Sequence, residues 1–342
     1  MKNTILSFLL PVLIFVSACS KTNTPSANNT VPPSNLTVTA NVSTDSSGNV
    51  AFIAAATNAT SYDFDFGDGG SLNVVSGITT YKYSNSGTYT VNVIAKNGSG
   101  LIISKSIQVI VVVTQAAIWS DEFNINGAPD ASKWTYDLGA GGWGNSELQY
   151  YTNRPSNVIV QNGVLKITAV KESYSGSSYT SARIKSQGLY SFTYGRVEIS
   201  AKLPSAVGTW PALWMLGSNI TNTAWPACGE MDIMEQKGNE LNKIYGTIHY
   251  PGHSGGGGVG STLTIANSST QFHKYTLDWS AAAIKMYVDN VLYLTVPNTG
   301  SLPFNQNFFF IINMAMGGTF GGTVSPSFTT DTMEVDYIRV YK

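Results

Sequence analysis

The chain has 342 residues, of which 43% are hydrophobic and only 11% are charged, and its formal net charge at pH 7 is −1. Such a chain lacks the basic surface that nucleic acid or a strongly sulfated polysaccharide requires, which argues against both partners and favours a neutral one. Ser, Thr, Asn, Gly and Tyr solvate the surface instead, a composition typical of turn-rich β-structure.

The first 18 residues predict an export signal. Lys2 precedes an apolar stretch, Ile5–Val16, that is too short to span a bilayer. The stretch ends in VSAC at residues 16–19, which is similar to the lipobox of bacterial lipoproteins. We expect residues 1–18 to be a lipoprotein signal peptide and Cys19 to be the acylated anchor of an exported bacterial lipoprotein, at the outer membrane or cell surface. An ordinary signal peptide that contains a cysteine is the alternative.

Residues 19–35 are rich in Ser, Thr, Asn and Pro and predict a flexible tether. From 36 to 114, short alternating runs separated by Gly, Asn and Ser predict a small antiparallel sandwich. The segments YDFDFGDG (62–69) and GTYTV (87–91) resemble the PKD domain, an immunoglobulin-like module. Its aspartates do not form an EF-hand loop, because Gly67 and Val74 stand where acidic ligands are needed, so a tight turn is expected.

The remainder, residues 117–342, again alternates with period two. Strands are expected at 158–168, 196–202, 275–279, 308–315 and 335–341, and no window of ten or more residues has helical periodicity. A mostly-β segment of this length predicts a large two-sheet sandwich, one face of which could hold a polymer.

An acidic cluster stands out in WPACGEMDIMEQ (225–236), where three of the chain's 20 acidic residues fall within six positions. On a strand, Glu230 and Asp232 share a face, whereas strict alternation would turn Glu235 to the opposite face. We therefore expect a β-bulge at Ile233–Met234. Two carboxylates about 5–5.5 Å apart are the catalytic pair of a retaining glycosidase. Acidic protection of an edge strand and a cation site are the alternatives.

Aromatic side chains flank the cluster. Trp210 and Trp214 lie four positions apart, and Trp225 precedes the acids. Indole faces stack on the C–H faces of sugar rings, so these residues predict a glycan cleft, although core packing would explain them equally well. By alternation Cys228 shares a face with Glu230, and we expect it to pack as a small side chain.

Collinear segments across residues 117–342 resemble glycoside hydrolase family 16, in its laminarinase branch. They are WSDEF (119–123), GWGN (142–145), ELQYYT (147–152), SARI (181–184), YGRVE (194–198), WPALW (210–214), GEMDIME (229–235) and VDYIRVY (335–341). The resemblance implies a concanavalin-like jelly-roll sandwich with Glu230 as nucleophile, Asp232 assisting and Glu235 as acid/base. It also implies endo-acting, retaining hydrolysis of β-1,3-glucan, with mixed-linkage β-1,3-1,4-glucan as a further substrate.

The same resemblance implies further site residues. The groove would be lined by Asn145, Glu147, Arg183, Trp210, Trp214, His249 and Glu240. Catalysis would need no cofactor, but a structural calcium ion would be held by Asp336 with the carbonyls of Glu122 and Gly163. The chain would act as a monomer. Met231 and Ser146 depart from the residues that are common in the family at these positions.

Two other readings remain open. A non-catalytic, lectin-like glycan-binding protein would share the sandwich and its cleft, although it would have no reason to keep all three acids of the cluster. A galactan hydrolase of the same fold would keep the acids and change the sugar.

Overall fold

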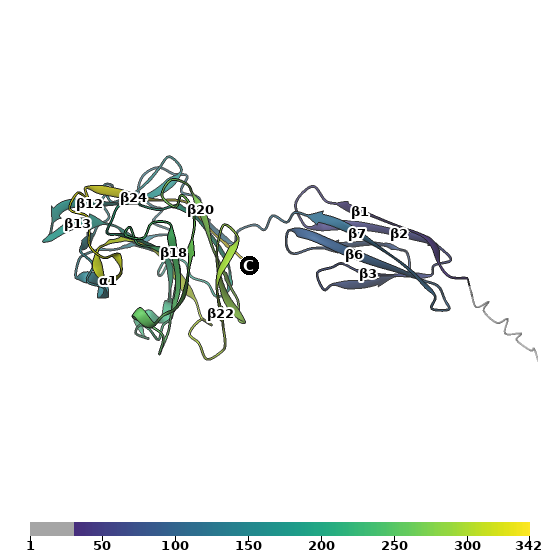
Figure 1. Ribbon diagram of the computed structural model, residues 1–342. Helices are drawn as coiled ribbons and strands as arrows, with labels where there is room; N and C mark the ends of the chain where they lie inside the picture. The colour runs from purple at the N-terminus through teal and green to yellow at the C-terminus, as the bar shows by residue number, and fades with distance from the viewer. Residues whose placement is uncertain (1–30) are drawn as a thin grey trace, which may run out of the picture. The chain divides into compact units, whose positions relative to one another are not determined.

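The computed structural model describes residues 31–342, so the predicted signal peptide and Cys19 lie outside the described residues. The chain divides into two compact units at Gln115 and Ala116. Almost every described element is a strand (Figure 1). The one α-helix among the described residues, α1 (Gly318–Gly321), is a single turn. The predicted all-β class is therefore confirmed. Within the described part of the chain, no helix has the length and apolar character needed to cross a membrane.

In the described part of the first unit, residues 31–115, seven strands form two antiparallel sheets. One sheet pairs β1 (Ser34–Val42), β2 (Asn49–Thr57) and β5 (Ile78–Lys82), and the other pairs β4 (Ser71–Val74), β3 (Ser61–Asp65), β6 (Gly87–Lys96) and β7 (Ile102–Val111). Alternate side chains face inward, so that Phe52, Phe64 and Phe66 are fully buried with ring centroids 5.5–6.0 Å apart. Burial of each large apolar side chain contributes about 1.5–3 kcal/mol. This unit thus has a core of its own.

The Gly-Asp-Gly segment of the first unit forms the predicted tight turn. The backbone N–H of Gly67 donates to Asp65, and that of Gly70 donates to Asp68. Gly67 has φ +79°, and a Cβ there would lie 2.5 Å from the carbonyl oxygen of Thr90. Glycine is therefore required by both the backbone conformation and the available space.

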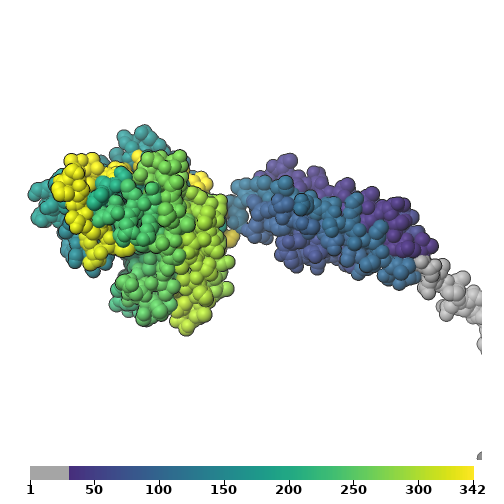
Figure 2. Space-filling model, viewed as in Figure 1, coloured from purple at the N-terminus to yellow at the C-terminus, as the bar shows by residue number. Residues whose placement is uncertain are grey.

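The second unit is a sandwich of a ten-stranded and a seven-stranded sheet. The ten-stranded sheet runs β10 (Gln149–Tyr151), β13 (Ser177–Ser181), β12 (Val164–Tyr174), β24 (Thr330–Tyr341), β15 (Gly195–Lys202), β20 (His273–Trp279), β21 (Ala283–Val288) and β22 (Val291–Pro297), with β11 (Val158–Gln161) beside β12 and β8 (Trp119–Asp121) beside β24. Strands far apart in sequence, such as β12 and β24, lie side by side (Figure 1). Teal, green and yellow segments consequently adjoin on the surface of this unit (Figure 2).

The seven-stranded sheet positions the site. Its order is β19 (Val259–Thr264), β18 (Lys243–His249), β17 (Glu230–Gln236), β16 (Thr209–Gly217), β23 (Phe308–Met316), β14 (Arg183–Lys185) and β9 (Thr135–Asp137). One face packs on the ten-stranded sheet through a shared core that includes Leu213, Met231 and Ile312. We call the other face the open face.

One sequence prediction about the strands was wrong. Residues 158–168 were expected to be one strand, but they form a hairpin in which Gln161 pairs with Val164. Asn162 and Gly163 occupy the turn with φ of +59° and +79°. Asn-Gly is the preferred pair for a two-residue hairpin turn, because both residues tolerate positive φ. The Asn162-Gly163 dipeptide could have predicted this turn, but the period-two alternation continues on both sides of it.

Candidate active site

The three acids of the cluster lie on strand β17, and the strand is bulged as predicted. Glu230 pairs with Leu216 of β16 and with His249 of β18, whereas Glu235 pairs with Ala212 and Tyr245. Between these pairs β17 has one residue more than either neighbour. Ile233 and Met234 are therefore both buried in the core, and Glu235 returns to the open face with Glu230.

The bulge is held by a side chain from the other sheet. Tyr293 of β22 donates its hydroxyl to the carbonyl oxygen of Ile233 at 2.8 Å. Gly246 of β18 leaves the space for this contact, since a Cβ there would lie 2.5 Å from the Tyr293 hydroxyl. The hydrogen bond satisfies a backbone carbonyl that the irregular ladder would otherwise leave unpaired.

Electrostatics in the cluster favour bound protons. Burial raises the pKa of Glu230, Asp232 and Glu235 above their usual range. The charge on Asp232 raises the pKa of Glu230 further, and the charge on Glu235 does the same for Asp232. His249 acts in the opposite direction on Glu230 and Glu235, whose pKa values it lowers, and its Nε2 lies 3.7 Å from Glu230 Oε1 and 3.2 Å from Asp232 Oδ2. The carboxyls thus titrate as a coupled group.

Trp210 orients one carboxyl of the cluster. Its Nε1 donates to Glu235 Oε1 at 2.8 Å, and this hydrogen bond lowers the pKa of Glu235 against the effect of burial. The Trp210 ring packs against Phe320 of α1, with centroids 5.2 Å apart, and Phe320 in turn contacts Tyr245 at 5.1 Å. Glu235 therefore lies beside an aromatic wall.

Trp214 joins the open face to a buried chain of hydrogen bonds. Its Nε1 donates to Asn313 at 2.7 Å, Asn313 donates to the Tyr151 hydroxyl at 3.0 Å, and Tyr151 donates to Glu147 at 3.2 Å. Asn145 also donates to Glu147, at 3.3 Å. Asn145 and Glu147 are thus linked to Trp214 through Tyr151 and Asn313, two residues that sequence reasoning missed.

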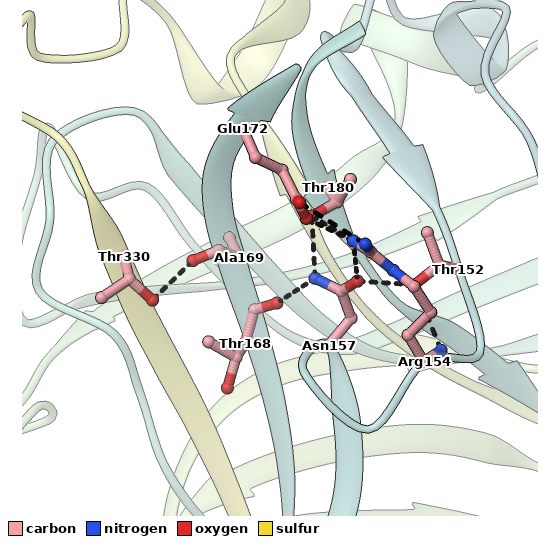
Figure 3. A network of polar contacts seen from close by, with 8 residues as sticks. All are labelled: Thr152, Arg154, Asn157, Thr168, Ala169, Glu172, Thr180 and Thr330. Carbon is pink, nitrogen blue, oxygen red and sulfur yellow. Dashed lines mark hydrogen bonds and ion pairs between the residues drawn. The ribbon is translucent and has the colours of Figure 1, made fainter. Parts of the chain in front are cut away.

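A polar network behind β10 fixes the strand that carries Tyr151. Arg154 forms an ion pair with Glu172 and donates to Asn157 at 3.0 Å and to Thr180 at 3.2 Å. Asn157 donates to the carbonyl of Thr168 at 3.1 Å, so the loop after β10 is attached to both β12 and β13 (Figure 3). Satisfied networks of this kind rigidify the segments they join.

Arg183 lies at the end of the same row. Its guanidinium is 4.8 Å from the centroid of Trp214 and 5.0 Å from that of Trp143, and its Nε pairs with Asp137 at 2.9 Å. A hollow of about 290 Å³ opens here. Its lining residues are Asp137, Arg183, Lys185, Gln187, Leu216, Ile220, Thr221, Phe309 and Ile311. Glu240, the last of the predicted groove residues, lies on the Glu235 side of the face: it pairs with Lys237 and Lys243 and accepts a hydrogen bond from the Tyr245 hydroxyl.

Cys228 packs in an apolar cluster beside this hollow with Leu216, Phe309 and Ile311. Burial raises the pKa of its thiol to about 11. The thiol is therefore protonated near neutral pH and does not act as a nucleophile.

The three residues predicted to bind calcium flank one gap in the pairing along β24. Strand β12 pairs with β24 as far as Val335, and β8 pairs with β24 from Ile338 onward. Residues 336 and 337 of β24 lie between these two paired stretches. Gly163 precedes β12, Glu122 follows β8, and Asp336 falls between the two paired stretches. The Glu122 carboxylate is bound by Arg339 at 2.7–2.9 Å, which leaves its backbone carbonyl as the available ligand. Carbonyl and carboxylate oxygens are ligands that suit calcium.

Known protein families match both units of the chain. Residues 145–339 match glycosyl hydrolases family 16, and residues 22–113 match the PKD domain. The beta-glucanase of Rhodothermus marinus is 44% identical over 241 residues, which cover 66% of this chain and 84% of the relative.

Two solved structures extend the comparison. The laminarinase of Rhodothermus marinus has a TM-score of 0.64 at 44% identity, covering 67% of this chain and 98% of that one. SCLam, a non-specific endo-beta-1,3(4)-glucanase, has a TM-score of 0.62 at 41% identity, covering 66% of this chain and 91% of that one. The second unit thus has the predicted jelly-roll sandwich, and the chain belongs to glycosyl hydrolases family 16, as a retaining glycoside hydrolase that carries a PKD domain.

Proposed function

We propose that the protein is an endo-acting β-1,3-glucanase that cleaves laminarin-type glucan, with mixed-linkage β-1,3-1,4-glucan as a further substrate. The observation that carries the proposal is the bulged strand β17, which presents Glu230, Asp232 and Glu235 on the open face between Trp210 and His249. Likeness to a laminarinase and to a 1,3(4)-glucanase supports the choice of linkage.

In the proposed reaction Glu230 attacks the anomeric carbon while Glu235 gives its proton to the departing glycosidic oxygen. The glycosyl ester is then hydrolysed by water, whose proton Glu235 accepts. Burial raises the pKa of Glu235, which keeps the acid protonated at a pH where an exposed carboxyl would be ionised. The Trp210 hydrogen bond leaves the other carboxyl oxygen of Glu235 to face the substrate.

Asp232 controls the charge on the nucleophile. Glu230 must be ionised to attack, yet the charge on Asp232 is the largest neighbouring effect that raises its pKa. A proton on Asp232, whose own pKa is raised by burial, removes that repulsion and leaves Glu230 ionised. His249 and Arg183 favour the same state, because both lower the pKa of Glu230.

The proposal is tested by incubating the purified protein with laminarin and following reducing ends. We expect Glu230→Gln to lower kcat by about 10³-fold or more, the loss typical of a missing nucleophile. Asp63→Asn in the first unit, which also removes one carboxylate, should leave the rate unchanged. Cleavage of agarose instead of laminarin would identify a galactan hydrolase, and laminarin binding without any cleavage would identify a lectin-like protein.

We further propose that a structural calcium ion is held by Asp336 and the carbonyls of Glu122 and Gly163. The register supports this, because Gly163 and Glu122 adjoin the stretch of β24 that contains Asp336. The ion would tie the start of the second unit to its last strand. Chelation should then lower Tm in the wild type and leave Tm unchanged in Asp336→Asn; an equal loss in both would rule the site out.

For the N-terminal segment, we propose export and anchoring by acylation of Cys19, at the outer membrane or cell surface, with the chain acting as a monomer. The VSAC motif supports the anchor. Mass spectrometry of the mature N-terminus should find a lipid-modified Cys19, and Cys19→Ala should release the protein from the membrane fraction. Light scattering of the released form should give the mass of one chain.

A further inference from the structure

Three side chains that are suitable as metal ligands meet at the nucleophile. One ligand atom each from Glu230, Asp232 and His249 lies within 4.8 Å of the other two. Nε2 of His249 is 3.2 Å from Asp232 Oδ2 and 3.7 Å from Glu230 Oε1. Around tetrahedral Zn²⁺, with bonds of about 2.0–2.2 Å, neighbouring ligand atoms are about 3.3–3.6 Å apart. The two distances from His249 bracket that spacing, and the two carboxylate oxygens, which lie within 4.8 Å, can reach it by side-chain rotation.

A second observation points to a missing partner. Asp232 is only 4% exposed, and its Oδ2 accepts no hydrogen bond from any described residue although it faces His249. An acceptor that is buried without a hydrogen-bond donor destabilises the folded state. The proposed glucanase mechanism uses the charge or proton of Asp232 and assigns no partner to this oxygen. A cation between Oδ2 and the imidazole would supply one.

The sheet holds the three ligands in place. Glu230 and His249 are directly paired across β17 and β18, and Asp232 is paired with Thr247 two positions along. The His249 ring is also packed near Trp225, with centroids 6.0 Å apart. The side chains of Glu230 and His249 are 17% and 12% exposed, so the site is accessible from the open face. A preorganised, accessible set of this kind binds metal without a rearrangement of the backbone.

We propose that Glu230, Asp232 and His249 bind one divalent transition metal ion, Zn²⁺ in the first place, and that the bound ion inhibits the enzyme. The inhibition rests on the proposed glucanase function, because a carboxylate of Glu230 that coordinates a metal is no longer free to attack the anomeric carbon. One imidazole and two carboxylates suit Zn²⁺ or Cu²⁺. Ca²⁺ and Mg²⁺ prefer six or more oxygen ligands and are not expected here.

The binding test uses chelator-treated full-length protein titrated with ZnCl2 in a calorimeter. We expect one Zn²⁺ per chain at this site, and His249→Gln should weaken binding by more than about tenfold, the loss that even outer-shell changes cause. His273→Gln is the matched control, because that imidazole pairs with Asp289 at the edge of the other sheet. Glu230→Gln gives a second variant if His249→Gln does not fold. Unchanged zinc affinity in a folded variant of either ligand would overturn the site.

The kinetic test adds ZnCl2 to the laminarin assay. Competitive inhibition, reversed by chelator and reproduced by neither Ca²⁺ nor Mg²⁺, supports the proposal. Zinc that binds through His249 without slowing cleavage overturns the inhibitory role. A wild type that binds zinc in this way and cleaves no glucan keeps the metal site and rejects the glucanase. Glucan cleavage without His249-dependent zinc binding keeps the glucanase and rejects the metal site.

Discussion

The two units of the chain are both antiparallel sandwiches, yet they treat polar side chains differently. Among the described residues, the first unit buries one polar side chain, Asn97, whereas the second buries fifteen, including Asp232, Gln149 and Asn313. Each buried polar group has a desolvation cost that hydrogen bonds must offset. Part of that cost in the second unit falls at the proposed site, where Asp232 belongs to the acidic cluster and Asn313 holds Trp214.

Carboxylates show the same contrast. Asp63 of the first unit pairs with Lys96 and hydrogen-bonds Asn73, and these partners hold its pKa below the usual value. Glu230 and Glu235 have their pKa values raised by burial. The acidic run of the first unit therefore consists of surface carboxylates that are paired or that cap turns. The acidic run of the second unit is a buried cluster whose pKa values are raised. Burial, and not the number of acids, separates the two cases.

The largest expected effect tests whether the units are independent. Phe66→Ala removes a fully buried ring from the first unit and should lower its free energy of unfolding by about 3–5 kcal/mol. Glucan cleavage should persist, because the second unit has a separate core. Calorimetry would resolve the two unfolding transitions, and the reducing-end assay would report the activity. Loss of glucan cleavage together with loss of first-unit stability would show that the two units are not independent.

A smaller effect is expected from Trp210→Phe, which keeps an aromatic ring and removes the hydrogen bond to Glu235. We expect kcat to fall about tenfold, the effect of losing one hydrogen bond to the acid. Because this hydrogen bond lowers the pKa of Glu235, its loss should raise that pKa and move the alkaline limb of the pH–rate profile upward. Trp225 donates no hydrogen bond to Glu235, so Trp225→Phe serves as the control. An alkaline limb that stays in place would show that Trp210 does not tune the acid.

The smallest predicted effect concerns stability. The pKa of Glu230 is higher in the folded protein than its unfolded value near 4.3, so the folded state binds the proton more tightly. The free energy of unfolding therefore falls as pH rises from the unfolded pKa to the folded one, and the loss is complete above both. Glu230→Gln removes this penalty.

We accordingly expect Glu230→Gln to have a higher Tm than the wild type, with a larger difference near pH 8 than near pH 4. Thermal melts at the two pH values measure the difference. Asp63→Asn, whose carboxylate has a lowered pKa, should be destabilising at the higher pH. Equal Tm changes at both pH values in Glu230→Gln would contradict a buried, proton-holding nucleophile.

The sequence was most informative where function is encoded in one segment. The bulge at Ile233–Met234 followed from three acids that had to share a face, and the all-β class followed from alternation. Asn313 was missed because it lies within the apolar run FFFIINMAM, and its role depends on Tyr151, which is 162 positions away. A single amide in a fully buried strand was the available signal. The hairpin at Asn162–Gly163 was missed because alternation continues on both sides of the turn.

The contact between Tyr293 and the bulge limits which substitutions the enzyme tolerates at positions 293 and 246. The hydroxyl of Tyr293 reaches the bulge from the opposite sheet, and it can do so only where position 246 has no side chain. The offset between the two glutamates thus depends on two residues that take no part in bond cleavage. In a library of random variants selected only for glucan hydrolysis, we expect position 246 to stay glycine and position 293 to stay tyrosine, as strictly as the glutamates themselves.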